Sequence, residues 1–152
     1  MKRKRFKKDN SKKERQFYKK ELFKLKEIIK DCKFIRVGRK ELQYERQLVC
    51  YLRGRLNNNE IFDYEKSDCF GRHRLDIVYK LKKNRNIGIE LKFFRSGYKL
   101  YGLLGQCKEY LETGDYDRIL AVILTDRHSS VIDSWVNKLN KVQKLEAISI
   151  EL

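Results

Sequence analysis

The 152-residue chain contains no proline, and none of its four cysteines forms a C-x-x-C pair. Without that pair we expect reduced, buried cysteines rather than a redox or zinc motif. The spacing Cys69-x3-His73 provides only half of a tetrahedral zinc site. No run approaches the roughly 18–20 apolar residues that span a bilayer, and no apolar segment follows the basic N-terminal residues. These absences predict an intracellular, cytoplasmic protein that is neither secreted nor inserted in a membrane.

Acidic residues are scarce relative to basic ones. The chain has 21 Asp and Glu against 37 Lys and Arg, a formal net charge of +16. Residues 1–30 contain 14 of the basic residues and 4 of the acidic ones, and therefore carry +10 of that charge. A field of this sign favours polyanions, and we expect nucleic acid, DNA first. The alternative is a solvated helix whose lysines only confer solubility, and the charge alone does not separate the two.

The uneven charge divides the chain into a basic N-terminal arm, residues 1–30, and a domain, residues 31–152. We expect the first ten residues to be disordered, because like charges repel and few of these residues are apolar. From about Ser11 apolar residues recur at steps of three or four, which predicts a helix.

Beyond the arm, the hydrophobic pattern predicts alternating helices and strands. One run, residues 117–125, is almost continuously apolar, as in a strand buried on both faces. Ser130 is the expected N-cap of the helix that follows. The order predicts an α/β fold in which three antiparallel strands precede two that join the sheet in parallel. The expected elements are a helix over 39–56, strands over 60–65, 74–81 and 86–94, a helix over 99–112, a strand over 117–125, a helix over 130–142 and a strand over 146–151.

Two of the expected strands combine apolar and charged residues in alternation. On the second strand, Leu75 and Ile77 are expected on the core face, and Asp76 on the opposite face. On the third strand, Glu90 and Lys92 alternate with apolar residues and are directed to that same opposite face. A tight turn between these strands places Asp76 opposite Glu90. Opposed Cβ atoms lie about 4.5–5.5 Å apart, so the two carboxylates could share one divalent cation.

The helix before the sheet supplies a third acid. Glu45 lies at the centre of an apolar arc that includes Leu48 and Val49, and a carboxylate there is costly unless a charged group receives it. Glu41 lies at the edge of the same arc and is the weaker candidate. The alternative for all these residues is a solvated surface, but their combination favours a catalytic site.

These residues resemble the motif of the PD-(D/E)XK nuclease superfamily, and the resemblance extends from about Arg39 to the C-terminus. Asp76 matches the motif aspartate, Glu90 the second acid and Lys92 the lysine, while Leu75 replaces the proline. The resemblance implies a restriction-endonuclease-like αβββαβ core with a mixed central sheet flanked by helices, to which the basic helical arm is added.

The activity implied by the resemblance is hydrolysis of phosphodiester bonds in DNA by an Mg²⁺- or Mn²⁺-dependent nuclease, most simply an endonuclease. Asp76, Glu90 and the backbone carbonyl of Leu91 would hold the metal through oxygen atoms. Glu45 would hold a second metal or a water molecule. Lys92 would orient the attacking hydroxide or stabilise the transition state.

Two further resemblances bear on the substrate. Residues 44–49 resemble the first helix of archaeal Holliday-junction resolvases, a subclass that would require a homodimer. Residues 106–110 resemble the Q-x-x-x-Y motif of RecB-type nucleases, in which case Gln106 and Tyr110 would face the cleft or the DNA. Phosphate contacts are also expected from the basic run beside the motif, Arg72, His73 and Arg74.

Other hypotheses stay open. The fold could serve as a catalytically inactive DNA- or RNA-binding module, or the chain could have a protein-interaction role with incidental basicity. An aromatic group beside the motif is expected to belong to the core rather than to stack on bases. This group comprises Phe93, Phe94, Tyr98 and Tyr101.

Overall fold

The computed structural model describes residues 2–38, 40–56, 61–63, 75, 77–94 and 97–152. The chain divides into two compact units, Met1–Asp31 and Cys32–Leu152. None of the helices within the described residues is long and apolar enough to cross a membrane.

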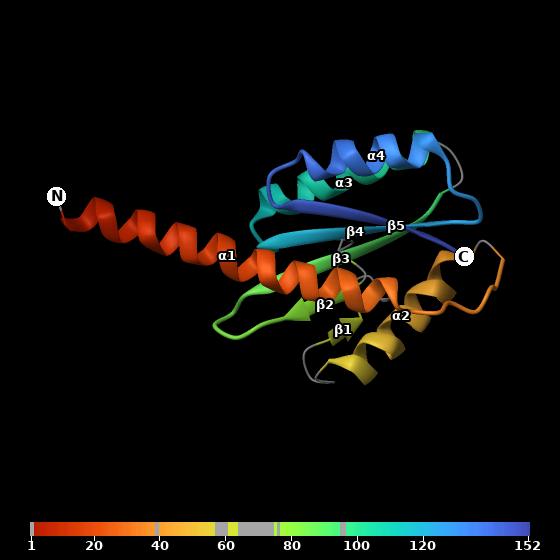
Figure 1. Cartoon of the computed structure of the whole chain (residues 1–152), viewed down its shortest axis with the longest axis horizontal. Coiled ribbons are helices and arrows are strands. Elements are labelled where there is room, and N and C mark those ends of the chain that lie inside the picture. The colour runs from red at the N-terminus through yellow and green to blue at the C-terminus, as the bar shows by residue number, and fades with distance from the viewer. Residues whose placement is uncertain (1, 39, 57–60, 64–74, 76, 95–96) are drawn as a thin grey trace. The chain divides into compact units, whose positions relative to one another are not determined.

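The described residues of the first unit form one helix, α1, which spans Lys2–Lys30 (Figure 1). It begins at Lys2 rather than near Ser11. Its apolar residues Leu22, Leu25 and Ile29 follow the three- and four-residue steps of one helical face. Lysines and arginines occupy most of the remaining positions. The disorder expected for the first ten residues stays a prediction.

In the described part of the second unit, five strands form a mixed sheet with the order β1-β2-β3-β4-β5. The first three strands pair antiparallel. The last two strands join in parallel, since each follows a helical connection. The predicted α/β class, and the prediction of three antiparallel strands followed by two parallel ones, are therefore confirmed. The strands are β1 Ile61–Asp63, β2 Ile77–Lys80, β3 Asn86–Phe93, β4 Arg118–Thr125 and β5 Leu145–Glu151.

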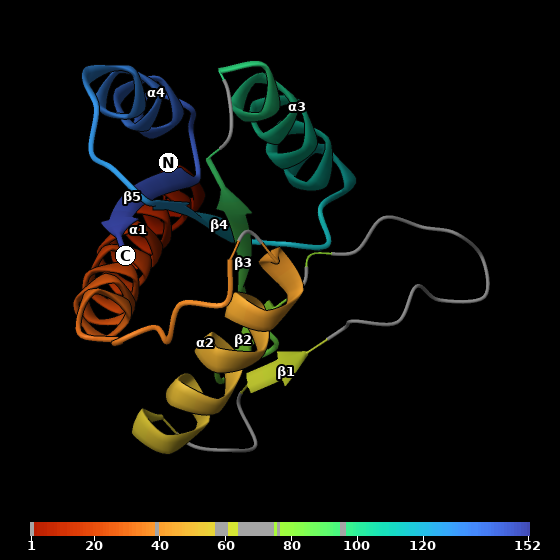
Figure 2. The ribbon, with the colours of Figure 1, turned by 90° about the vertical axis from the view of Figure 1, so that its right-hand side faces the viewer.

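Among the residues that the structure describes, three helices cover the two faces of this sheet. Figures 1 and 2 show α3 and α4 together on one face and α2 on the other. Seven of the eight residues of β4 are buried, which confirms the prediction of a strand enclosed on both sides. The helices are α2 Glu41–Arg55, α3 Gly97–Thr113 and α4 Ser130–Asn140.

The N-cap predicted for α4 was wrong by one residue. Ser129, not Ser130, has the extended backbone of a cap, and its Oγ accepts a hydrogen bond from the N–H of Ile132 at 3.4 Å. Both serines have the right side chain, and only the backbone conformation distinguishes the capping residue.

The hairpin between β2 and β3 has the predicted register. Lys83 and Asn84 both have positive φ values, 61° and 56°, as tight hairpin turns require. Ile77 lies opposite Ile89, and the remaining pairs follow in sequence. Asp76, for which this register was derived, lies outside the described residues.

The prediction for the face of Leu75 was wrong. Its side chain belongs to the apolar cluster that also contains the buried residues of α3 and α4. A Cβ on Gly88 would lie well under 3.0 Å from the Leu75 side chain. Gly88 shares a sheet face with Glu90, because strand residues two apart point the same way. Leu75 precedes β2, so the alternation of that strand does not extend to it, and the hydroxyl of Tyr116 accepts its N–H at 3.2 Å.

Candidate active site

Strand β3 places Glu90 and Lys92 on one face near its carboxyl end. In the parallel pairing Glu90 lies beside Ala121 and Lys92 beside Ile123, and these two β4 residues belong to the apolar cluster shared with α3 and α4. The charged face was predicted to be opposite the core, but both faces of β3 are covered. Glu90 is only 3% exposed. A solvated strand face therefore does not explain this carboxylate.

The ammonium of Lys92 lies between two carboxylates. Its Nζ is 3.6 Å from Oε1 of Glu90 and 3.8 Å from Oε2 of Glu41. The three side chains, named here the Lys92 cluster, are largely withdrawn from water: 4% of Glu90, 24% of Lys92 and 28% of Glu41 is exposed. Attraction between opposite charges is stronger there than at an open surface, because less water screens it.

Glu41 reaches the cluster because the first turn of α2 contacts the end of β3. Its Oε1 accepts a hydrogen bond from the backbone N–H of Phe93 at 3.2 Å. One turn along the same helix side, Tyr44 stacks on the ring of Phe93, with 5.9 Å between centroids and 25° between planes. An aromatic contact and a charge-assisted hydrogen bond thus fix the helix start against the strand.

Glu45 is buried, as its place in the apolar arc predicted. It is 6% exposed and is accompanied on α2 by buried Leu48 and Val49. A carboxylate in this setting costs free energy unless it is hydrogen-bonded or near a cation. Together with the cluster it makes three acids that are withdrawn from water on α2 and β3.

Helix α3 lies close to the cluster, and its Cys107 is near enough to feel the charges of Glu90 and Lys92. Cys107 is fully buried on this helix. Burial, and to a lesser degree the nearby carboxylate of Glu90, raise the pKa of its thiol to about 12, while the ammonium of Lys92 opposes the rise. Cys107 therefore stays a protonated thiol and leaves the charges of β3 in a setting of low polarity.

The donor chemistry of these residues fits a hard divalent cation. Carboxylate oxygens are the ligands that Mg²⁺ and Mn²⁺ prefer, and Glu90 and Glu41 already flank one positive charge. No group of three or more His, Cys, Asp or Glu side chains arranged to hold a metal ion occurs among the described residues. Asp76, the acid expected on the second strand, lies outside the described residues.

The other predicted site residues have different surroundings. Leu91, whose carbonyl was a predicted ligand, lies between the two charged residues of β3, with its side chain buried. Gln106 is half-buried, whereas Tyr110 belongs to the apolar cluster and packs edge-to-face on Tyr116 at 5.8 Å. Their contact with substrate stays a prediction. The predicted phosphate contacts Arg72, His73 and Arg74 lie outside the described residues.

The members of the aromatic group differ in burial. Phe93 is in the core, as expected, but the prediction for Tyr101 was wrong, because this residue is 70% exposed. Tyr101 meets Trp135 edge-to-face at 5.8 Å, so the two rings pack on each other across α3 and α4. Tyr98 has a side chain outside the described set.

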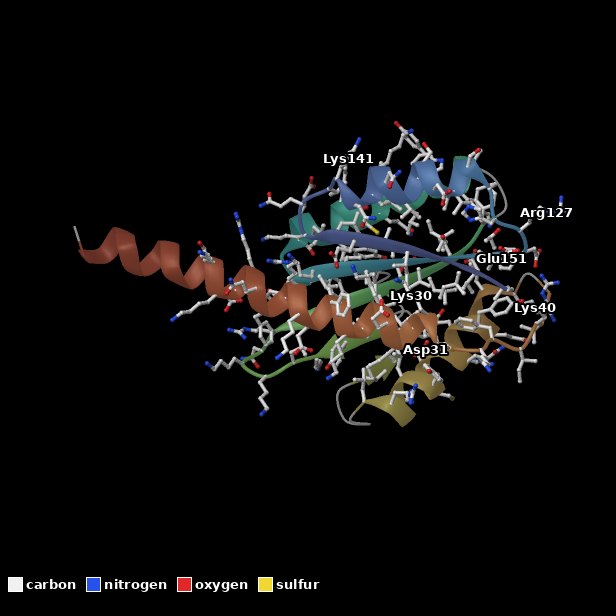
Figure 3. The ribbon with its side chains drawn as sticks, in the orientation of Figure 1. Lys30, Asp31, Lys40, Arg127, Lys141 and Glu151 are labelled. Atoms are coloured by element: carbon white, nitrogen blue, oxygen red, sulfur yellow. The ribbon has the colours of Figure 1, made fainter. Side chains whose placement is uncertain are left out.

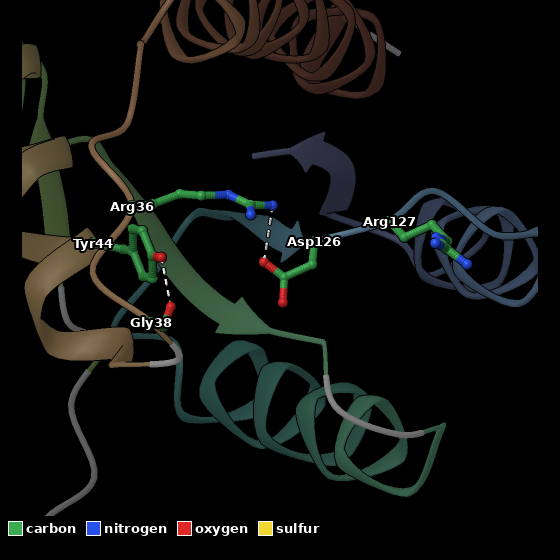
Figure 4. A pocket seen from close by; sticks show the side chains of 5 residues that line it. All are labelled: Arg36, Gly38, Tyr44, Asp126 and Arg127. Atoms are coloured by element: carbon green, nitrogen blue, oxygen red, sulfur yellow. Dashed lines mark hydrogen bonds and ion pairs between the residues drawn. The ribbon is translucent and has the colours of Figure 1, made fainter.

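A pocket of about 540 Å³, which no sequence pattern indicated, opens at the same sheet edge as the Lys92 cluster. Asp126 and Arg127 directly follow the carboxyl end of β4. The opposite wall comes from the segment before α2, where Arg36 reaches the carboxylate of Asp126 at 3.2 Å (Figure 4). Figure 3 shows Lys40, Arg127 and Glu151 at this end. The lining residues are Arg36, Gly38, Tyr44, Asp126 and Arg127.

The fold and these two features define an α/β protein with a buried acid–lysine cluster and a basic pocket at one sheet edge. No protein-family model matches the chain, and searches of curated proteins and of solved structures found no match either. Function is therefore argued from the residues and their geometry.

Proposed function

We propose that the protein is an Mg²⁺- or Mn²⁺-dependent nuclease that hydrolyses phosphodiester bonds in DNA. The observation that carries the proposal is the Lys92 cluster, in which a nearly inaccessible Glu90 and a second acid, Glu41, flank one ammonium. A chain with a net charge of +16 supplies the long-range attraction for a polyanionic substrate.

The proposed fold is restriction-endonuclease-like. Its support is the element order α2-β1-β2-β3-α3-β4, which has the αβββαβ pattern, and the position of the acid and the lysine on the third strand. In mixed α/β sheets, ligands commonly bind beyond the carboxyl ends of the parallel strands. Lys92 and Glu41 meet at that end of β3.

Each residue has a role that its surroundings allow. Glu90 and Asp76, with the carbonyl of Leu91, would hold the metal, and Glu45 would hold a second metal or a water molecule. The bound ion would supply a lowered pKa of water and charge withdrawal from the scissile phosphate. Lys92 would orient the attacking water and offset the negative charge that develops in the transition state.

Glu41 is added to the roles expected from the sequence. Its contact with Lys92 at 3.8 Å and its hydrogen bond from Phe93 make it a positioning residue, which holds the ammonium and the helix start together. Its negative charge also offsets the positive charge of the lysine in a place that little water reaches.

The test is cleavage of supercoiled plasmid, linear duplex and a four-way junction with Mg²⁺, Mn²⁺ or EDTA, beside the Glu90→Ala variant. We expect metal-dependent cleavage that the variant lacks. Preference for the junction would select the Holliday-junction resolvase subclass and its homodimer. DNA binding without cleavage of any substrate would favour the inactive binding module instead.

A further inference from the structure

The pocket at the end of β4 is a second charged site, distinct from the acidic side chains proposed to hold metal. It has two guanidinium groups and one carboxylate, so its described side chains carry an excess of one positive charge. Arg36 uses part of its hydrogen-bonding capacity on Asp126 and on the carbonyl of Leu152, both at 3.2 Å. This fixes the group in place at the pocket wall.

Arg127 is the available cation. Its guanidinium has no hydrogen bond or ion pair within the described part of the chain, whereas its backbone is held by the hydroxyl of Thr125. Figure 4 shows Arg127 on the other side of Asp126 from Arg36, with its guanidinium directed away from both. A phosphate at the pocket would compete with Asp126 for Arg36 and would draw in the exposed Arg127 side chain, which has no competing partner among the described residues.

The backbone around the pocket also favours an anion. Gly38 has a φ of +72°, with open space where a Cβ would stand, and its carbonyl accepts a hydrogen bond from Tyr44 at 2.6 Å. Helix α2 begins just beyond, and its N-cap Lys40 makes no side-chain capping bond. A helix N-terminus carries a partial positive charge, which adds to that of the arginines and is partly offset by the Glu41 carboxylate in the same first turn.

The pocket and the Lys92 cluster are linked by one aromatic contact. Tyr44 lines the pocket and stacks on Phe93, whose N–H is bound by Glu41 of the cluster. The two features also lie at the carboxyl ends of the paired strands β3 and β4, and this placement motivates a path for one nucleic-acid strand across both. Arginine pairs with phosphate through two parallel hydrogen bonds, which a lysine does not do.

We propose that Arg36 and Arg127 form a phosphate-binding site that holds a nucleic-acid backbone phosphate next to the one cleaved. The position relative to cleavage rests on the proposed function, but binding in the pocket does not. Asp126 holds Arg36 in place when the pocket lacks an anion and yields to phosphate on binding.

The experiment is the salt dependence of binding to a labelled DNA duplex, measured by fluorescence anisotropy in EDTA. The variants are Arg127→Gln, Asp126→Asn and Lys141→Gln, which removes an exposed charge at the opposite end of the sheet (Figure 3). Arg127→Gln should weaken binding and reduce the salt slope by about 0.9, the value of one phosphate contact on duplex DNA. Lys141→Gln should leave the slope unchanged.

The direction in which Asp126→Asn changes DNA affinity discriminates most sharply. The variant should tighten binding, because it removes the negative charge that competes with phosphate for Arg36, which stays held by the Leu152 carbonyl. Equal slopes for Arg127→Gln and Lys141→Gln, or weaker binding by Asp126→Asn with an unchanged melting temperature, would overturn the proposal. Inorganic phosphate that binds to the wild type and not to Arg127→Gln, without any change in DNA slope between these two, would assign the pocket to a free anion and also overturn it.

Because EDTA prevents metal-dependent cleavage, the result does not depend on nuclease activity. A chain that binds through the pocket yet never cleaves would contradict the proposed function and leave the phosphate site standing.

Discussion

The Lys92 cluster and helix α1 differ in how far their charged side chains are exposed to water. In the cluster, Glu90 is almost inaccessible to water and shares one ammonium with Glu41. In α1, lysines and arginines follow one another along the helix, and Lys12 and Lys13 are exposed. Exposed charges cost little and attract any polyanion, whereas a buried charge must be offset locally.

This difference suggests separate roles: α1 would attract nucleic acid, and the cluster would take part in the proposed cleavage. A basic helix increases the rate and strength of association with nucleic acid without specifying what happens next. A carboxylate beside an ammonium in a setting of low polarity acts on particular atoms, because its field is not screened. Changes in the cluster should therefore alter turnover, and changes in α1 should alter binding.

The largest effect should come from Lys92→Met, which removes the ammonium and keeps a side chain of similar length. Cleavage should fall by on the order of 10²–10³-fold, the cost of removing one preorganised electrostatic partner of a transition state. Lys82→Met, an exposed position in the β2–β3 turn, is the control. Equal reductions in the two variants, measured as single-turnover rates on folded protein, would contradict the role of Lys92.

Glu41→Gln should have the next largest effect. Glutamine can still accept the hydrogen bond from Phe93, but it no longer offsets the positive charge of Lys92. We therefore expect cleavage to fall by roughly 10–100-fold, the usual cost of removing a group that orients the residues around a metal. Glu41→Asp, which keeps the charge, should recover part of the rate. Equal rates for the wild type and Glu41→Gln would reduce Glu41 to a structural contact. Glu109→Gln, an exposed acid on α3, provides the matched control.

Packing beneath the cluster can be tested at Gly88. A Cβ there would overlap the side chain of Leu75, so Gly88→Ala should destabilise the fold by about 1–3 kcal/mol. Gly102→Ala, in α3 with no atom near its Cβ position, should instead stabilise by up to about 1 kcal/mol. Urea unfolding measures both changes. The double variant Gly88→Ala with Leu75→Ala should be destabilised by less than the sum of the two single changes, because the shortened side chain removes the overlap. Two destabilisations that simply add would refute the overlap.

Charge on α1 should affect binding alone. The double variant Lys12→Gln and Lys13→Gln keeps helix propensity nearly constant. It should lower the salt slope of DNA binding by about 0.9 for each phosphate that the two lysines neutralise in the wild type. The cleavage rate at saturating DNA should not change. Lys108→Gln, exposed on α3, is the control. A reduced saturated rate would mean that α1 does more than attract.

The smallest effect concerns Cys107. Because the pKa of its thiol is about 12 in the folded chain and 9.0 as an ordinary thiol, the folded state favours the protonated form. The stability contributed by this group is present below pH 9.0 and is lost as pH rises towards 12. Cys107→Ser should make urea stability fall less steeply above pH 9.0 than in the wild type. Parallel curves would contradict the pKa shift.

Much of the fold follows from local pattern. The β2–β3 register could be derived because the turn Lys82–Arg85 is short and polar, and β4 was recognisable because it has no polar face. The inward position of Glu45 followed from helical periodicity. Such features depend on residues close together in the chain, so sequence spacing contains them.

The misses depend on contacts between distant segments. Leu75 turns to the α3 and α4 side because Gly88 leaves space there. Glu41 was placed at the edge of an arc, and only the crossing of α2 over the end of β3 brings it to Lys92. The pocket joins the segment before α2 to the residues after β4, and no spacing rule connects Arg36 with Arg127.

The central claim is that Glu90 is a metal ligand in the Lys92 cluster, and Mn²⁺ binding without DNA tests it most directly. Calorimetric titration of the wild type and of Glu90→Gln, with melting temperatures as the folding control, avoids any choice of substrate. We predict that the wild type binds Mn²⁺ and that the variant binds it at least about tenfold more weakly. Identical Mn²⁺ affinity in the two folded proteins would contradict the account.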